Sequence, residues 1–150
     1  MGVILRKASF EDAKIILEWR NDRVTRENSF SKDIIDYETH IKWFASKLED
    51  ENCFMYMMES DEETVGQIRI DRVNGFGEIS YMIAPAKRGM GYGKKILSLI
   101  ENNLPDKVEC LLGLVENQNG ASKKCFEDNG YSVFPGGEIT CFAKIVNADK

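Results

Sequence analysis

The sequence predicts a mixed α/β or α+β fold built on one central sheet. A first strand and two helical patterns are followed by a meander of strand patterns, and then by helices and strands in alternation. The composition, 43% hydrophobic and 30% charged, is that of a folded globular protein. At 150 residues the chain is predicted to form one domain, residues 1–150, with about six or seven strands and about four helices.

The first fifty residues are predicted to hold the first strand and the first two helices. Ser9 and Asp12 have the spacing of a capping box, and apolar residues then recur at helical spacing as far as Arg20. This pattern predicts a helix from about residue 10 to residue 20. A polar stretch, residues 21–32, follows it. The next helical face is formed by five apolar residues: Ile34, Tyr37, Ile41, Phe44 and Leu48.

From Cys53 onward the apolar pattern changes to the period of strands. Four strands are predicted, at residues 53–59, 64–73, 78–83 and 108–116. The last of these is near-continuously apolar, which predicts burial on both of its faces. A helix is predicted after residue 93 and a short one in residues 119–131, closed by Asn129 and Gly130. Residues 131–146 are predicted to form two final strands around a Pro-Gly-Gly turn.

Charge and hydropathy exclude several classes of protein. The net charge of -5 and a pI near 5.0 argue against a nucleic-acid-binding protein, which normally has a basic surface. No segment approaches the ~18 consecutive apolar residues of a membrane span. The first residues lack the pattern of a signal peptide and the serine or threonine of a myristoylation site. The protein is therefore expected to be cytoplasmic, with no membrane partner.

The cysteines and the one histidine do not predict a metal site. Cys53, Cys110, Cys125 and Cys141 are widely spaced, without a C-x-x-C pair, and His40 is the only histidine. Cys53, Cys110 and Cys141 each stand in an apolar run, where a free cysteine behaves as a small hydrophobic residue. We therefore expect these three to be buried and structural, and we expect no bound metal.

The segment R-G-M-G-Y-G, residues 88–93, indicates an anion-binding loop. It stands between a predicted strand and a predicted helix, and glycines allow a ligand to approach the backbone closely. The first amides of a helix lack partners, and the helix dipole favours negative charge there. The segment is not a P-loop, because no serine or threonine follows a correctly placed lysine, and Ile96 breaks the dinucleotide pattern G-x-G-x-x-G.

Two motifs in the correct order resemble the GNAT family of acetyl-coenzyme A-dependent N-acetyltransferases. The first is R-x-x-G-x-G, here Arg88, Gly91 and Gly93, and the second is the stretch N-G-A-S-K-K-C-F-E-D-N-G-Y that starts at Asn119. The predicted order of elements is similar to that of the family from end to end. The resemblance implies a mixed, mostly antiparallel central sheet with flanking helices, and transfer of the acetyl group to a primary amine by direct attack.

The resemblance also implies a binding site for acetyl-coenzyme A. Its pyrophosphate would lie on the amides of six consecutive residues: Arg88, Gly89, Met90, Gly91, Tyr92 and Gly93. Its pantetheine arm would pair with the end of the strand that carries Met82, Ile83 and Ala84, and Asn119 would contact the arm from the other side. The backbone amide of Ile83 would stabilise the oxyanion.

The general base and the general acid are less well defined by the sequence. Candidates for the base are Glu78, Ser80 acting through water, and His40, although a packed or surface histidine is the alternative for the last. Many family members carry a tyrosine acid seven residues after the asparagine, but this chain has Phe126 there. Phe126 is expected to pack against the cofactor arm or the core. The acid role then falls to Cys125, to Tyr131, to water, or to no group, since thiolate is a fair leaving group.

The acceptor is indicated by the connection between the first two helices. Residues 20–32 contain four basic residues (Arg20, Arg23, Arg26 and Lys32) and two acidic ones, a local charge of +2 in a chain of -5. Arginines there favour an anionic acceptor such as a nucleotide-linked amino sugar, with Arg20, Arg23 and Arg26 as binding residues. The alternative is a solvated loop that balances neighbouring acids.

A looser resemblance supports the nucleotide sugar. The segment L-E-W-R-N-D followed by H-I-K-W-F is similar to the subgroup that acetylates nucleotide-activated 4-amino sugars. The alternatives are an N-acetyltransferase of a protein N-terminus or small amine, which the acidic chain favours, and a catalytically silent acetyl-coenzyme A-binding module. An exposed strand edge at the C-terminal hairpin would allow a homodimer.

Overall fold

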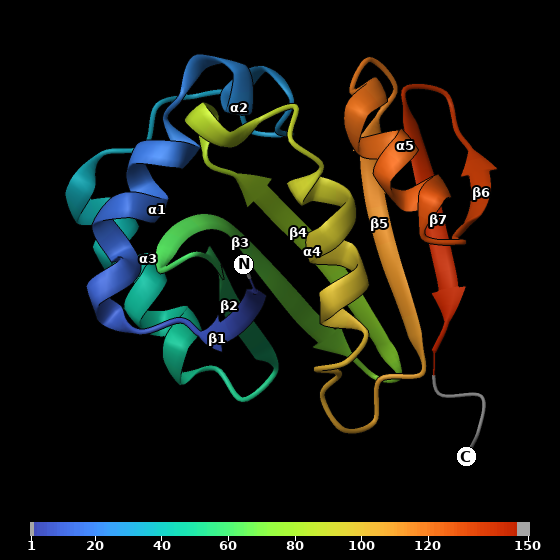
Figure 1. Cartoon of the computed structure of the whole chain (residues 1–150), viewed down its shortest axis with the longest axis horizontal. Coiled ribbons are helices and arrows are strands. Elements are labelled where there is room, and N and C mark those ends of the chain that lie inside the picture. The colour runs from blue at the N-terminus through green and yellow to red at the C-terminus, as the bar shows by residue number, and fades with distance from the viewer. Residues whose placement is uncertain (1, 147–150) are drawn as a thin grey trace.

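The computed structural model describes residues 2–146, so both ends of the predicted domain 1–150 lie outside the described residues. These residues form a seven-stranded mixed sheet in the order β1-β2-β3-β4-β5-β7-β6. Among the described strands β4 and β5 pair in parallel, and every other neighbouring pair is antiparallel (Figure 1). The strands are β1 (Val3–Lys7), β2 (Cys53–Ser60), β3 (Glu63–Val73), β4 (Phe76–Ile83), β5 (Cys110–Glu116), β6 (Ser132–Pro135) and β7 (Ile139–Ile145). The predicted α+β class with a mostly antiparallel sheet is confirmed.

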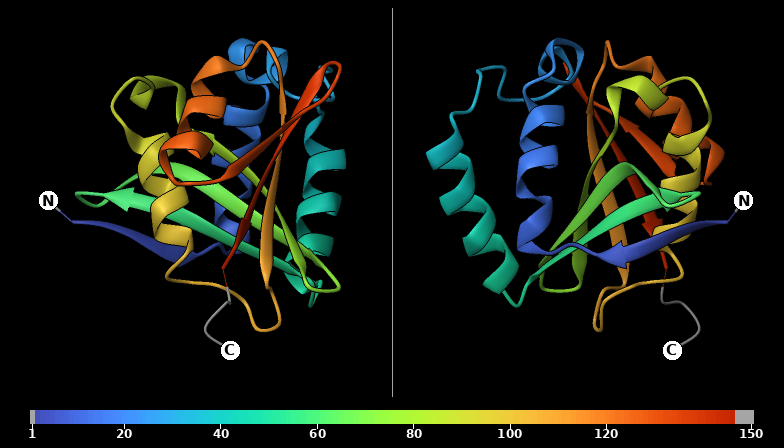
Figure 2. Two further views of the ribbon diagram at one scale, coloured as in Figure 1. Left: turned by 90° about the vertical axis from the view of Figure 1, so that its right-hand side faces the viewer. Right: turned by 60° about the vertical axis from the view of Figure 1, so that its left-hand side comes forward.

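Helices cover both faces of the sheet. The α-helices are α1 (Ala13–Arg20), α2 (Arg23–Glu27), α3 (Tyr37–Glu49), α4 (Tyr92–Ile100) and α5 (Gly120–Asp128), and the 3-10 turns are η1 (Phe10–Asp12) and η2 (Pro85–Lys87). Figure 2 shows α1 and α3 on one side and α4 and α5 on the other. Each side has its own apolar core, one around Phe44 and Met57 and the other around Ile96 and Phe126. The site described below lies at a break in the sheet, with one helical layer on each side of it.

The predicted helices of the N-terminal half are present, but the predicted apolar face of the second is wrong at two positions. The first begins as the turn η1, whose Asp12 accepts hydrogen bonds from the Ser9 amide (2.9 Å) and from Arg6 (2.8 Å). The second begins only at Tyr37, and the predicted apolar face is wrong at two positions: Ile34 is 68% exposed and Tyr37 is 60% exposed. The buried positions of α3 are His40 and Phe44, one helical turn apart, whereas Ile34 precedes the first residue of the helix and so has no place on its face.

The helix α2 forms in the stretch predicted only to be polar. Asp22 caps it by accepting hydrogen bonds from the amides of Val24 (3.1 Å) and Thr25 (3.2 Å). None of its residues is buried, so no apolar period marks it in the sequence. A local cap therefore produces this helix, and hydrophobic packing does not.

Two predictions of burial are wrong. Leu114 in β5 is 42% exposed, because the neighbouring strand β4 no longer pairs with β5 at that point. Cys53, Cys110 and Cys141 are half-buried, as is Cys125. Burial still raises the pKa of the Cys53 thiol to about 11, so this thiol stays protonated at neutral pH.

None of the helices within residues 2–146 combines the length and the apolar character needed to cross a membrane. In the same part of the chain, no three His, Cys, Asp or Glu side chains are grouped in a way that could hold a metal ion.

Candidate functional site

The strands β4 and β5 separate part-way along their length, and this gap is the centre of the site. They pair only over residues 76–79 of β4 and 110–113 of β5. Beyond these residues β4 stays paired with β3 as far as Ile83, and β5 stays paired with β7 as far as Glu116 (Figure 1). The inner edges of both strands therefore carry backbone groups that have no strand partner.

The direction of the amides in β4 follows from its pairing with β3. The Ala84 amide donates to the carbonyl of Val65 at 2.9 Å. Because successive residues of an antiparallel strand point their N–H groups to opposite sides, the amides of Tyr81 and Ile83 point toward the gap. The Ala84 carbonyl accepts from the Lys87 amide at 2.8 Å, so both backbone groups of Ala84 are occupied. Ile83 thus presents a free N–H to the gap.

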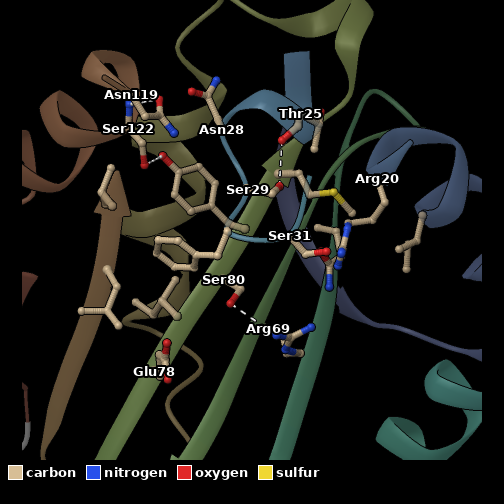
Figure 3. A pocket seen from close by; sticks show the side chains of 18 of the residues that line it. Arg20, Thr25, Asn28, Ser29, Ser31, Arg69, Glu78, Ser80, Asn119 and Ser122 are labelled. Carbon is tan, nitrogen blue, oxygen red and sulfur yellow. Dashed lines mark hydrogen bonds between the residues drawn. The ribbon is translucent and has the colours of Figure 1, made fainter. Parts of the chain in front are cut away.

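A pocket of about 350 Å³ is lined by residues on both sides of this gap. Figure 3 shows Asn119, which precedes α5, and Ser122 of α5 on one side and Arg20 and Arg69 on the other, with Ser80 of β4 between them. One side of the pocket thus presents amide and hydroxyl groups, and the other presents two guanidinium groups.

The loop between η2 and α4 presents a run of unpaired amides. Gly89 and Gly91 have φ angles of 76° and 85°, and a Cβ added to either would meet no atom within 4 Å. Within the described part of the chain, no amide of residues 88–94 donates a hydrogen bond, and the bond from Lys95 to the Gly91 carbonyl (3.1 Å) is the first of α4. Open space, free amides and a helix N-terminus together can bind an anion.

The side chain of Arg88 joins this loop to α2. Its Nη2 lies 2.6 Å from Oδ2 of Asp22 and 2.8 Å from Oγ1 of Thr25. The hydrogen bond from Arg88 is the main reason why the pKa of Asp22 lies below its usual range. The guanidinium therefore already has hydrogen-bond partners at α2. An anion at this loop would bind the backbone amides instead.

Two guanidinium groups face the pocket from the opposite side. Arg69 donates to Asp71 at 2.8 Å and lies over the ring of Trp43 at 5.1 Å, and Lys47 binds the same carboxylate at 3.0 Å. One carboxylate therefore balances two cations. Arg20 has no carboxylate partner among the described residues, and burial, followed by the charge of Arg69, lowers its pKa. This side of the pocket carries an excess of positive charge.

Residues 3–132 match the family described as acetyltransferase (GNAT) domain. The chain belongs to the GNAT acetyltransferase family. It is an acetyl-coenzyme A-dependent enzyme, as the two sequence motifs imply. No curated protein sequence matches the chain significantly.

Solved structures share the fold of this GNAT acetyltransferase over nearly its whole length. Aminoglycoside acetyltransferase AAC(6')-Ib in complex with coenzyme A is 16% identical, with a TM-score of 0.84 over 98% of this chain and 96% of that chain. Spermidine N-acetyltransferase from Vibrio cholerae in complex with coenzyme A and spermine is 14% identical, with a TM-score of 0.85 over 96% and 95%. A domain from Methanocaldococcus jannaschii is 19% identical, with a TM-score of 0.83 over 96% and 98%. At these identities the likeness concerns the fold alone.

Two residues of the second GNAT motif have different surroundings. Asn119 caps α5 by accepting from the Ser122 amide at 3.3 Å, and its Nδ2 donates to no residue in the described chain. Phe126 is 2% exposed, with its ring stacked on Phe142 at 5.2 Å and edge-on to Tyr131 at 5.0 Å. Of the two surroundings expected for Phe126, the structure gives the core, and the residue also lines the pocket.

The other two arginines predicted to bind the acceptor do not line this pocket. Arg23 is exposed and pairs with Glu27 one turn along α2, at 3.0 Å. Arg26 donates to the backbone carbonyls of Asn21 (3.1 Å) and Lys32 (3.3 Å). The first therefore stays on the surface, and the second stabilises the loop after α2.

The three candidate bases also lie in different places. His40 is buried, its Nε2 lies 2.8 Å from the Ala13 carbonyl, and burial lowers its pKa. It is absent from the pocket lining and packs on the core instead. Glu78 and Ser80 both line the pocket, where Ser80 accepts a hydrogen bond from Arg69 at 3.4 Å.

Trp43, Arg69 and Tyr81 are among the pocket residues that sequence reasoning missed. Gln67, Arg69 and Asp71 alternate along β3 and so share one face of the sheet. This alternation could have shown that Arg69 shares a face with Gln67 and Asp71. It could not have shown which helix covers that face. In β4 the same alternation places Tyr81 on the opposite face of the sheet from Ser80 and Met82.

Proposed function

We propose that this acetyltransferase, acting as one domain over residues 1–150, binds acetyl-coenzyme A between the loop 88–94 and the gap. The free amides of the loop support a pyrophosphate site formed by six residues: Arg88, Gly89, Met90, Gly91, Tyr92 and Gly93. The free amide of Tyr81 and Nδ2 of Asn119 support a pantetheine site along the inner edge of β4, which ends at Ile83. Met82 contributes its side chain, and Ala84, whose backbone is occupied, contributes only shape.

The reaction assigns two further roles to residues of β4. Acetyl-coenzyme A supplies the acetyl thioester, which the neutral amine attacks. The Ile83 amide is suited to stabilise the negative charge that develops on the acetyl oxygen. Glu78 is suited to take the proton of the amine, and it does so through water. A strand rises ~3.3 Å per residue, so the Cα atoms of Glu78 and Ile83 are about 16 Å apart, and the proton must pass along more than one water to reach the carboxylate.

The acceptor is an amine that carries an anionic group, such as a nucleotide-linked amino sugar. One observation carries this conclusion: Arg20 faces the pocket beside Arg69 without a carboxylate of its own. A phosphate accepts two parallel hydrogen bonds from a guanidinium and neutralises it. The same pair of cations repels a polycationic acceptor, because like charges in a partly buried site are screened poorly.

Replacing Arg20 by Met is expected to lower kcat/KM for nucleotide-linked 4-amino sugars by about 10- to 100-fold, which is the worth of a charged hydrogen bond. The assay is thiol release from acetyl-coenzyme A, with nucleotide-linked 4-amino sugars, the same sugars without the nucleotide, polyamines, amino acids and N-terminal peptides as acceptors. Arg23→Met is the matched control, because Arg23 is exposed and outside the pocket. It is expected to keep full activity.

Turnover of polyamines or peptide N-termini in preference to the sugars would contradict the proposed acceptor, as would an Arg20→Met enzyme that keeps its kcat/KM. Binding of coenzyme A without turnover of any amine would instead indicate a catalytically silent module. Coenzyme A affinity is therefore measured beside the assay for each variant.

A further inference from the structure

The usual acid position of the family offers no proton donor in this chain. Phe126 lies in the core, and the two neighbours that could replace it are poorly placed. The Tyr131 hydroxyl is buried without a hydrogen-bond partner in the described chain, and its ring lies behind that of Phe126. The Cys125 thiol faces Gly93 rather than the pocket, and a Cβ on Gly93 would lie 2.9 Å from its sulfur.

A different pair of hydroxyl groups lies at the gap. Oη of Tyr81 in β4 and Oγ of Ser122 in α5 are 2.8 Å apart, and both residues line the pocket. This contact bridges the two sides of the gap (Figure 3). Ser122 precedes Phe126 by four residues, so both side chains lie on the same face of α5. The hydroxyl that Phe126 lacks is thus present one turn earlier on that helix.

We propose that Ser122, positioned by Tyr81, donates a hydrogen bond to the sulfur that leaves when the acetyl group is transferred. As the new C–N bond forms, the C–S bond breaks with its electron pair on sulfur. Each hydroxyl has one proton, so when Tyr81 donates to Ser122 the proton of Ser122 is free for the sulfur. The proton of the amine departs separately, toward Glu78 and water, and no net proton transfer from Ser122 is needed.

The two faces of β4 separate the hydroxyl pair, which would act on the sulfur, from the side chains that face the acceptor. Side chains alternate along a strand, so Ser80 and Met82 face α1 and α3 whereas Tyr81 faces α4 and α5. Tyr81 lies 3.7 Å from the position of a Cβ on Gly93, in the first turn of α4 behind the anion-binding loop. The hydroxyl pair is therefore on the cofactor side of the gap, opposite Arg20. Burial raises the pKa of Tyr81, which keeps its hydroxyl protonated and able to donate.

The test compares Ser122→Ala, Ser122→Thr and Tyr81→Phe with the unchanged enzyme. Its first readout is the pKa of the thiol of bound coenzyme A. This pKa is measured from the absorbance of the thiolate, with the same protein without ligand as the reference. Ser122→Ala is expected to raise this pKa by about one unit and to lower kcat about tenfold, because one unit of pKa equals a tenfold change in equilibrium. Ser122→Thr keeps a hydroxyl and is expected to restore both, and Tyr81→Phe is expected to have an intermediate effect.

Ser98→Ala, an exposed serine of α4, is the control for loss of a hydroxyl and is expected to change neither readout. The affinity for coenzyme A reports whether each variant still folds its site. A thiol pKa that is the same in Ser122→Ala and the unchanged enzyme would overturn the proposal, even if kcat fell. It would also be overturned if Ser122→Thr behaved like Ser122→Ala.

Discussion

Phe126→Tyr is expected to destabilise the protein by about 1–3 kcal/mol and to leave acetyl transfer no faster. The ring of Phe126 ends on the bare backbone of Gly113, where a Cβ would overlap it. A hydroxyl added to that end of the ring needs space, and the backbone of Gly113 together with the packed rings of Phe142 and Tyr131 leaves little. The free energy of unfolding from urea titration, together with kcat, measures both effects.

Phe126→Leu is the control for this substitution, because it removes aromatic packing without adding a polar group. It is expected to cost stability through the cavity it leaves, with no change in the pKa of bound coenzyme A thiol. A Phe126→Tyr enzyme that is as stable as the unchanged protein and turns over faster would show that the ring can turn into the gap. The acid role would then belong to position 126.

Gly91→Ala is expected to weaken the binding of coenzyme A about tenfold. Gly91 has a φ of 85°, a left-handed conformation that costs an alanine ~1–2 kcal/mol. An added Cβ meets no atom within 4 Å, so the substitution changes backbone preference and nothing else. The residue precedes α4 directly, and a shift there misaligns the free amides of the loop. Titration calorimetry with coenzyme A measures the loss.

Gly137→Ala is the matched control for Gly91→Ala. A Cβ on Gly137 also meets no atom within 4 Å, but its φ is not in the left-handed region and it lies in the turn before β7. It is expected to leave coenzyme A affinity unchanged. Equal affinities for the Gly91→Ala protein and the unchanged protein would contradict the assignment of this loop to the pyrophosphate.

Local patterns in the sequence predicted the elements and the anion-binding loop. Strand alternation, the cap at Ser9 and the glycines at 89 and 91 act over a few residues, so they can be recognised without knowing the fold. The reason for the glycine at position 93 was nevertheless missed. Gly93 is small because α4 approaches Cys125 and Tyr81 closely, which is a matter of packing between distant segments.

The acceptor side could not be predicted in the same way. Arg20, Arg23 and Arg26 are equally basic in the sequence, but only Arg20 lies on the part of α1 that faces β3 and β4. Arg69 joins it from almost fifty residues away, through a sheet register that no local pattern fixes. The pairing of Tyr81 with Ser122 likewise depends on where α5 packs over the gap.

The most direct test of the central claim is amide hydrogen exchange, residue by residue, with and without coenzyme A. The claim is that the cofactor lies on the loop 88–94 and along the inner edge of β4. It predicts strong slowing of exchange at residues 88–94 and at Ile83, whose amides are free in this structure. A second cavity of about 540 Å³, lined by Trp19, Glu63 and Lys87 among others, offers a different location. Slowing around that cavity, with residues 88–94 unchanged, would contradict the claim.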